Sequence, residues 1–129
     1  MQGHLHYLHE EWVSMNIGDR IHVNLTLYPP MTALLYLLNE STMKSNSMTI
    51  HTKEPLCGHD VGWLVVTSPV DRLVGFGKVT FDGIRAVDVS GKLYDLADVT
   101  YKFDIEQRNH TLTHTTFDNS NTMSISYVQ

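Results

Sequence analysis

The clearest pattern of hydrophobic and polar positions lies in RIHVNLTLY, residues 20–28. Ile21, Val23, Leu25 and Leu27 alternate there with polar residues. Successive side chains of a strand point to opposite faces, so a two-residue period is typical of a half-buried strand. We therefore predict a strand with these four side chains inward. Leu25→Asp is then expected to destabilise the fold by several kcal/mol, because it would bury an unpaired charge.

The segment before this strand shows the same period. Val13, Met15 and Ile17 alternate with polar residues, and Gly18-Asp19 can form the turn between two strands. The pattern predicts a hairpin over residues 13–28. Two prolines follow at 29 and 30, and they end its second strand because proline has no N–H to donate to a ladder.

Residues 31–38, MTALLYLL, are apolar nearly throughout. As a helix this segment would be apolar all round, and as a strand it would be buried on both faces. We favour the strand, because the segment is short and bounded by Pro-Pro and Asn-Glu-Ser. The polar stretch 39–47 is interpreted as a loop, followed by a brief strand from Met48.

Short alternating segments continue to the end of the chain, separated by turn residues such as Asp82-Gly83 and Ser90-Gly91. In residues 98–106 the apolar residues of the alternation share one face. The predicted strands are WLVVT (63–67), VGFGKVTF (74–81), IRAVDV (84–89), KLYDL (92–96), DVTYKFDIE (98–106), TLTHTTF (111–117) and TMSISYV (122–128).

This rhythm of short strands, with few candidate helices, predicts a single all-β domain over residues 1–129. We expect an antiparallel β-sandwich of jelly-roll type, because each alternating strand supplies one inward face. A small closed β-barrel is the alternative architecture.

The charge balance argues against nucleic acid as a partner. The net charge is -5, and the nine Lys and Arg residues form no basic run that could follow a phosphate backbone. Eight histidines make the net charge sensitive to mild acid. We do not expect a membrane as a partner either, since the apolar run 31–38 is far too short to span a bilayer.

Cysteine usage bears on location. Cys57 is the single cysteine, so no intramolecular disulfide can form, which is typical of a cytosolic protein. With no secretory signal recognised at the N-terminus, we expect a soluble, cytoplasmic protein; an excised domain or a secreted protein is the alternative. Asn24, Asn39 and Asn109 begin Asn-x-Ser/Thr glycosylation sequons, which would matter only in the secreted case.

The stretch GHLHYLHEEW, residues 3–12, contains side chains that bind metals. On a strand, His4 and His6 point to the same side and can hold one ion together. On a helix they diverge, and Leu5, Leu8 and Trp12 instead form an apolar stripe. A metal site here therefore requires a strand. We favour exposed or packed histidines without metal and keep the metal site as the alternative.

The spacing His4-x-His6, four residues, Glu11, six residues, Gly18 is similar to the first metal-binding motif of the cupins. The second cupin motif is absent, and PLCGH at 55–59 corresponds to it only faintly. The resemblance implies a jelly-roll barrel in which His4, His6 and Glu11 bind a divalent metal. A further ligand would then come from another strand, with His59, His22 and His114 as candidates.

Two other motifs are less specific. Cys57, His59 and Asp60 are the residue types of a thiol nucleophile with its base, but we favour a turn with a partly buried thiol, because nucleophile and base usually come from distant segments. Gly75 to Lys78 lack the spacing of a phosphate-binding loop, and are interpreted as a strand with a bulge.

The sequence contains no phosphate-binding loop, no complete metal motif and no basic run. We therefore predict a noncatalytic binding or interaction module that recognises a protein partner or a small polar ligand, and no cofactor. The alternative is a cupin-like, divalent-metal-dependent enzyme using His4, His6 and Glu11. The sequence leaves the oligomeric state open.

Overall fold

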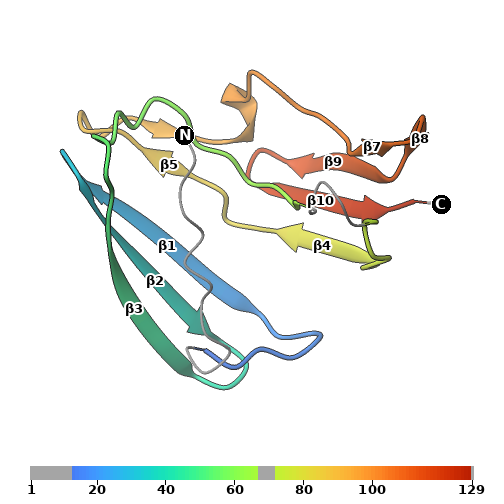
Figure 1. Cartoon of the computed structure of the whole chain (residues 1–129), viewed down its shortest axis with the longest axis horizontal. Helices are drawn as coiled ribbons and strands as arrows, with labels where there is room; N and C mark the ends of the chain where they lie inside the picture. Colours follow the sequence, from blue (N-terminus) through green and yellow to red (C-terminus); the bar gives the residue numbers. More distant parts are fainter. Residues whose placement is uncertain (1–12, 67–71, 129) are drawn as a thin grey trace. The chain divides into compact units, whose positions relative to one another are not determined.

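The computed structural model describes residues 13–66 and 72–128, and it is all-β (Figure 1). Its contacts divide the chain into two compact units, Met1–Asp60 (unit 1) and Val61–Gln129 (unit 2). Every strand pair is antiparallel. The prediction of a single domain over residues 1–129 stays a prediction.

Unit 1 contains a three-stranded sheet in chain order, with β2 in the centre. Its strands are β1 (Ile21–Tyr28), β2 (Thr32–Asn39) and β3 (Lys44–His51). The strand predicted over residues 20–28 is confirmed, and so is the strand interpretation of residues 31–38. β3 begins at Lys44, earlier than predicted, because its backbone pairs with β2 along its whole length although its first four side chains are polar and exposed.

Residues 13–19 do not form a strand, so the predicted hairpin over residues 13–28 is wrong. The physical reason is a local turn. The N–H of Asp19 donates to the carbonyl of Asn16 at 3.1 Å, and a carboxylate oxygen of Asp19 accepts from the N–H of Asn16 at 2.9 Å. These bonds fold the chain on itself, and β1 pairs with β2 instead.

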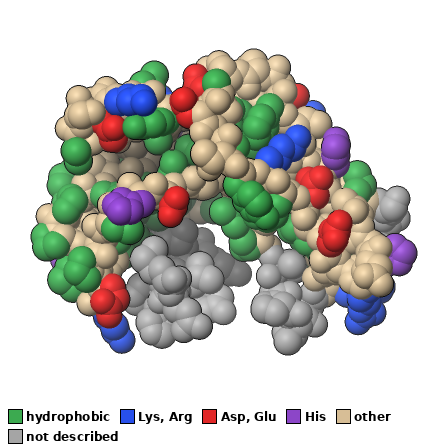
Figure 2. All heavy atoms as spheres, turned by 90° about the horizontal axis from the view of Figure 1, so that it is seen from above, with side chains coloured by type: hydrophobic (Ala, Val, Ile, Leu, Met, Phe, Trp, Pro, Cys, Tyr) green, Lys and Arg blue, Asp and Glu red, His purple; other side chains and the backbone are tan. Residues whose placement is uncertain are grey.

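The predicted inward face of β1 is also wrong: Val23, Leu25 and Leu27 are all exposed. The register places Leu25 opposite Leu35 and Val23 opposite Leu37, so these residues share one face of the sheet. Burial on that face is greatest on the central strand, at Ala33 and Leu37, because an edge strand has a neighbour on one side only. Figure 2 shows hydrophobic side chains at the surface in many separate places.

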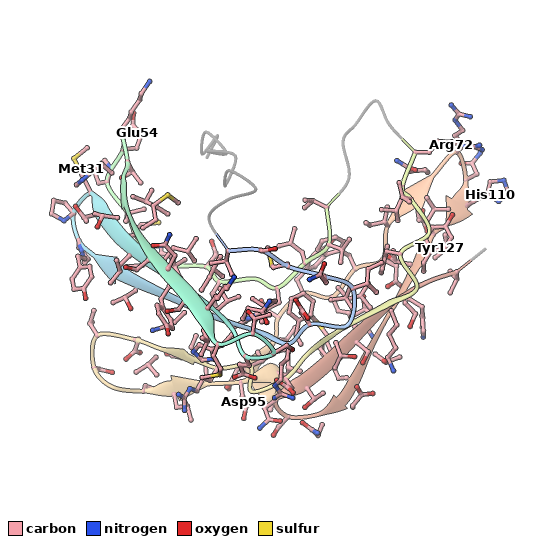
Figure 3. The ribbon with its side chains drawn as sticks, turned by 90° about the horizontal axis from the view of Figure 1, so that it is seen from below. Met31, Glu54, Arg72, Asp95, His110 and Tyr127 are labelled. Atoms are coloured by element: carbon pink, nitrogen blue, oxygen red, sulfur yellow. The ribbon has the colours of Figure 1, made fainter. Side chains whose placement is uncertain are left out.

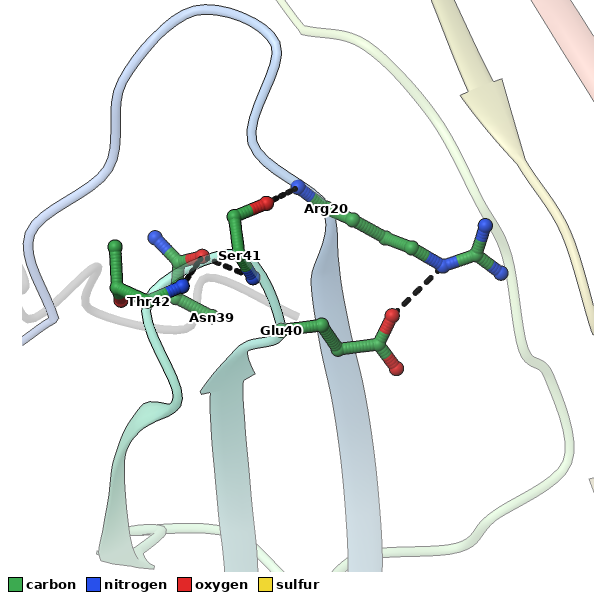
Figure 4. Close-up of polar contacts among 5 residues, drawn as sticks. All are labelled: Arg20, Asn39, Glu40, Ser41 and Thr42. Carbon is green, nitrogen blue, oxygen red and sulfur yellow. Dashed lines mark hydrogen bonds and ion pairs between the residues drawn. The ribbon is translucent and has the colours of Figure 1, made fainter.

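The β2–β3 corner of unit 1 is organised by Asn39, whose side chain is fully buried (0% exposed). Its amide oxygen accepts from the N–H groups of Ser41 at 3.0 Å and Thr42 at 3.3 Å (Figure 4). Its amide nitrogen donates to the carbonyl of Ser14 at 3.0 Å and to a carboxylate oxygen of Asp19 at 2.7 Å. One side chain thus joins the β2–β3 turn to the loop that precedes β1.

Unit 2 is built on a three-stranded sheet with the order β4-β10-β9 and two smaller strand pairs. Alternate side chains of β10 face its hydrophobic core, which contains Met123 and Ile125 together with Ile84 and Leu96. The elements are β4 (Lys78–Phe81), β5 (Ala86–Val87), β6 (Leu93–Tyr94), the 3-10 helix η1 (Leu96–Asp98), β7 (Glu106–Gln107), β8 (His110–Thr111), β9 (Thr113–Asn119) and β10 (Thr122–Tyr127).

Several predicted strands of unit 2 are shorter than expected. Residues 63–66 are not in a strand, and of the segment predicted over 98–106 only the last residue is. Asp95 and Asp98 form a capping box that starts a helical turn at Leu96, so the chain leaves the extended conformation there. Within the described residues no helix is long and apolar enough to cross a membrane. The cytoplasmic location stays a prediction.

Candidate functional site

The candidate site of unit 2 lies where residues 103–105 run beside β9, and we call it the β9 edge site (Phe103, Asp104, Thr113, His114 and Thr115). Two buried threonines attach the segment to the strand. The hydroxyl oxygen of Thr113 accepts from the N–H of Ile105 at 2.7 Å, and the Thr115 hydroxyl donates to the carbonyl of Phe103 at 3.4 Å. A backbone bond from Leu112 N–H to the Ile105 carbonyl, 2.7 Å, continues the contact.

Asp104 and His114 are the titratable groups of the β9 edge site. One carboxylate oxygen of Asp104 accepts from the N–H of Thr115 at 2.7 Å, which fixes the carboxylate. Its other oxygen lies 3.7 Å from Nδ1 of His114. The side chains are 29% and 62% exposed respectively, so the imidazole is open to solvent. An imidazole beside a fixed carboxylate can accept and donate a proton in a defined orientation.

A second polar cluster of unit 2, formed by Ser124, Asp118 and Thr80, has a structural role. Ser124 is 1% exposed, its hydroxyl donates to a carboxylate oxygen of Asp118 at 2.9 Å, and the hydroxyl of Thr80 lies 3.2 Å away. A serine nucleophile must reach its substrate, and Ser124 is too buried to do so. These residues therefore support the sheet.

Two aromatic side chains project from the segment that leads into the β9 edge site. Tyr101 is 78% exposed and Phe103 51% exposed, and their ring centroids are 5.6 Å apart. Lys102 is the residue between them in the sequence, and its ammonium lies 5.1 Å from the ring centroid of Phe117 on β9. The common face predicted for the apolar residues of 98–106 is thus solvent-facing at these two positions.

His4, His6 and Glu11, the metal ligands of the alternative hypothesis, lie outside the described residues, so the structure does not test that hypothesis. Of the suggested further ligands, His22 lies on β1, where its ring centroid is 6.2 Å from that of Tyr36. His59 is exposed in a loop. In the part of the chain that the structure describes, no three His, Cys, Asp or Glu side chains gather closely enough to hold a metal ion.

The other sequence motifs have simple surroundings. Cys57, His59 and Asp60 are all exposed, and Gly58 takes a φ of +61°, as a turn requires. Lys78 is the first residue of β4, and Gly77 before it has a φ of +76°, so the GFGK segment leads directly into a strand. His110, on β8, lies at the same end of unit 2 as Arg72 (Figure 3).

Sequence reasoning missed the pairing of Asp104 with His114. The two residues belong to different segments, and their contact depends on residues 103–105 lying against β9. The signal present in the sequence was weak: Thr113 and Thr115 alternate at the strand period, which places both hydroxyls on one face.

Comparisons with known proteins bear on the chemistry. The sequence model of the Peptidase A4 family matches residues 5–127. The crystal structure of aspergilloglutamic peptidase from Aspergillus niger is similar to this one, with a TM-score of 0.79 and 24% sequence identity over 90% of this chain and 70% of that chain. No curated protein matches the chain. The structural likeness confirms the predicted all-β, antiparallel sandwich fold.

The same comparisons correct the functional predictions. A noncatalytic binding or interaction module is wrong, because a peptidase family matches nearly the whole chain. The expectation that the protein is not an enzyme is wrong for the same reason, and a cupin-like metal enzyme is the wrong class. The short cupin-like spacing covered only residues 4–18, too few to identify a family.

Proposed function

Because the chain belongs to the Peptidase A4 family, we propose that it hydrolyses peptide bonds in protein substrates. The observation that carries this proposal is the family match over residues 5–127, which spans residues of both units. A peptidase family implies a protein substrate, so the partner expected from the sequence narrows to a protein. Peptide hydrolysis needs a base that takes a proton from water and an acid that gives one to the leaving amine.

Asp104 and His114 supply such groups in the β9 edge site. In the proposed reaction, His114 removes a proton from water as the water oxygen bonds to the peptide carbonyl carbon. Asp104, held by the N–H of Thr115, then faces the imidazolium and stabilises its charge. The imidazolium returns the proton to the amine nitrogen as the C–N bond breaks, which leaves His114 neutral for the next cycle.

Glutamates are the competing candidates, since the similar structure is that of a protein named as a glutamic peptidase. Three of them are described. Glu40 is exposed and pairs with Arg20, with an oxygen-to-nitrogen distance of 2.7 Å, so its carboxylate is already engaged. Glu54, labelled in Figure 3, and Glu106 on β7 are also exposed. Asp104 differs from all three in being fixed beside an imidazole.

To test the proposal, an unfolded protein substrate is incubated with the purified chain from about pH 3 to pH 8. The peptides released by cleavage are identified by mass spectrometry. We expect His114→Gln to lower kcat/KM by about 100-fold or more, the range for loss of a general acid or base. Asp104→Asn should lower it too, although its amide oxygen can still accept from Thr115 N–H.

His110→Gln is the matched control, because His110 is also an exposed histidine of unit 2 but lies on β8. It should retain wild-type kcat/KM. No cleavage by the wild-type chain at any pH would overturn the proposed hydrolysis. Loss of activity in Glu54→Gln or Glu106→Gln, with His114→Gln unaffected, would instead move the chemistry to that glutamate.

A further inference from the structure

We propose that Lys78 is a substrate-binding residue of the β9 edge site, and that its ammonium holds a carboxylate on the first residue after the peptide bond to be cleaved. That carboxylate is the free C-terminus of the peptide or the side chain of an aspartate or glutamate. This inference rests on the proposed function and adds a substrate preference to it.

Lys78, Ser126 and His114 form one row across the three-stranded sheet of unit 2, and we call it the cross-strand row. Ser126 on the central strand β10 lies opposite Lys78 of β4 on one side and opposite His114 of β9 on the other. The three strands lie side by side in Figure 1. Residues directly opposite each other in antiparallel strands point to the same face. The side chains of Lys78 and Ser126 therefore share the face of the imidazole that is proposed as the base.

The other face of the sheet is packed. Ile125, the neighbour of Ser126 on β10, lies opposite Val79 and belongs to the hydrophobic core. Successive side chains of a strand alternate between faces, so the cross-strand row points away from that core. Lys78 and His114 are both exposed, and Ser126 is half-buried between them. A peptide can therefore approach the row from solvent.

The spacing of the row matches a short piece of peptide. Paired Cβ atoms of neighbouring strands are about 5 Å apart, so about 10 Å separates those of Lys78 and His114. The small side chain of Ser126 leaves space between the two longer ones. A peptide advances about 3.3–3.6 Å per residue. Hydrogen bonds of about 2.7–3.2 Å join the imidazole to the attacking water and the ammonium to the carboxylate. A carboxylate one residue beyond the scissile carbonyl therefore reaches Lys78.

The charges at the two ends of the row set the direction of the peptide. Asp104 lies beside His114 and repels a substrate carboxylate, whereas Lys78 attracts it from two strands away. The Lys78 ammonium forms no ion pair with any other residue that the structure describes. The next row on the same face is uncharged and consists of Thr80, Ser124 and Thr116.

The first test measures binding separately from cleavage. A dye-labelled peptide of about six residues has a ketomethylene group in place of its last amide, so it cannot be hydrolysed there. Three forms are titrated with the protein and followed by fluorescence anisotropy: one with a free C-terminus, one with a C-terminal amide, and one amidated with aspartate as its last residue. We expect a carboxylate form to bind about 5-fold more tightly than the neutral amide, as for a well-placed exposed ion pair. The tighter of the two carboxylate forms identifies the source of the carboxylate.

Variants assign the preference to one side chain. Lys78→Gln should abolish it and Lys78→Arg should retain it, because arginine keeps the charge. Lys92→Gln is the matched control, since Lys92 is another exposed lysine of unit 2 whose ammonium lies over the ring of Tyr94, and it should leave the preference unchanged. Raising the NaCl concentration from about 0.05 M to about 0.5 M should reduce the preference in the wild-type protein.

The second test follows cleavage of the same peptides with an ordinary last amide. We expect kcat/KM for loss of the last residue to be about 5-fold higher with the carboxylate than with the neutral amide, and equal in Lys78→Gln.

The outcomes separate the role of Lys78 from hydrolysis. Equal binding of all three peptides, or a preference that Lys78→Gln leaves unchanged, would overturn the role of Lys78 even if the chain cleaves protein. The expected binding pattern without any cleavage would support that role and reject the proposed hydrolysis. The expected results in both tests would support both.

Discussion

The side-chain amide of Asn39 donates a 2.7 Å hydrogen bond to the carboxylate of Asp19, twenty residues earlier in the chain. Asn39 is the last residue of β2, and Asp19 belongs to the turn that precedes β1. The contact therefore joins the end of the central strand β2 to the turn that leads into the edge strand β1.

We predict that Asn39→Ala destabilises the protein by about 2–4 kcal/mol, because two backbone N–H groups, a carbonyl and a carboxylate lose their partner at a buried site. Urea unfolding measures the change. Asn39→Asp keeps the size and the acceptor oxygen but places a second carboxylate against Asp19, so it should destabilise too. A loss below about 0.5 kcal/mol in the alanine variant would contradict the prediction.

Acid should weaken unit 1 through Asp19. The N–H of Asn16, and then the side chain of Asn39, hold the pKa of Asp19 below its ordinary value of 3.8. A carboxyl with a depressed folded pKa contributes stability above its unfolded pKa, and that contribution is lost as the pH falls through the folded value.

We therefore expect the free energy of unfolding to fall below about pH 4, and to fall less steeply in Asp19→Asn. Measurement of urea unfolding at several pH values compares the two slopes. Some acid dependence should remain in the variant, because hydrogen bonds, first from the Ser90 hydroxyl, also lower the pKa of Asp88. Identical slopes in both proteins would contradict the role of Asp19.

The exposed face of β1 gives a prediction opposite to that from the sequence. Leu37→Ala should destabilise the protein by about 2–4 kcal/mol, because Leu37 is 6% exposed on the central strand. Leu25→Ala should cost about 1 kcal/mol or less, since Leu25 is 56% exposed. Thermal or urea unfolding of the two variants checks the ranking, and a larger loss for Leu25→Ala would show that its face is covered.

Thr113 should control the attachment of residues 103–105 to β9. Thr113→Val keeps the side-chain shape and removes the acceptor for the N–H of Ile105. We expect a loss of about 1–2 kcal/mol in stability and faster hydrogen exchange at the Ile105 amide. Thr116→Val, at an exposed position of the same strand, is the control and should leave that exchange rate unchanged.

Local periodicity was a good guide where the sheet pairs neighbours in sequence. Alternation predicted β1, and the short apolar run between Pro-Pro and Asn-Glu-Ser predicted β2. Alternation did not predict which side chains are buried. Leu25 is exposed and Leu37 is buried because β1 is an edge strand and β2 the central strand, and alternation alone does not contain the order of strands in the sheet.

The candidate site was beyond local reasoning for a similar reason. Residues 98–106 alternate as a strand does, yet threonine side chains and not a regular ladder hold residues 103–105 to β9. The pairing of Asp104 with His114 follows from that attachment. Short motifs drew attention to His4, His6 and Glu11 instead, because adjacency in sequence is easier to recognise than adjacency across a fold.

The buried amide of Asn39 also decides the fate of a sequon. A glycan would be linked through the same nitrogen that donates to Ser14 and Asp19, and the side chain has no exposed surface from which a sugar could extend. A chain glycosylated at Asn39 before folding could not close this corner. Asn24 and Asn109 are exposed, so only these two positions are compatible with both a sugar and the folded state.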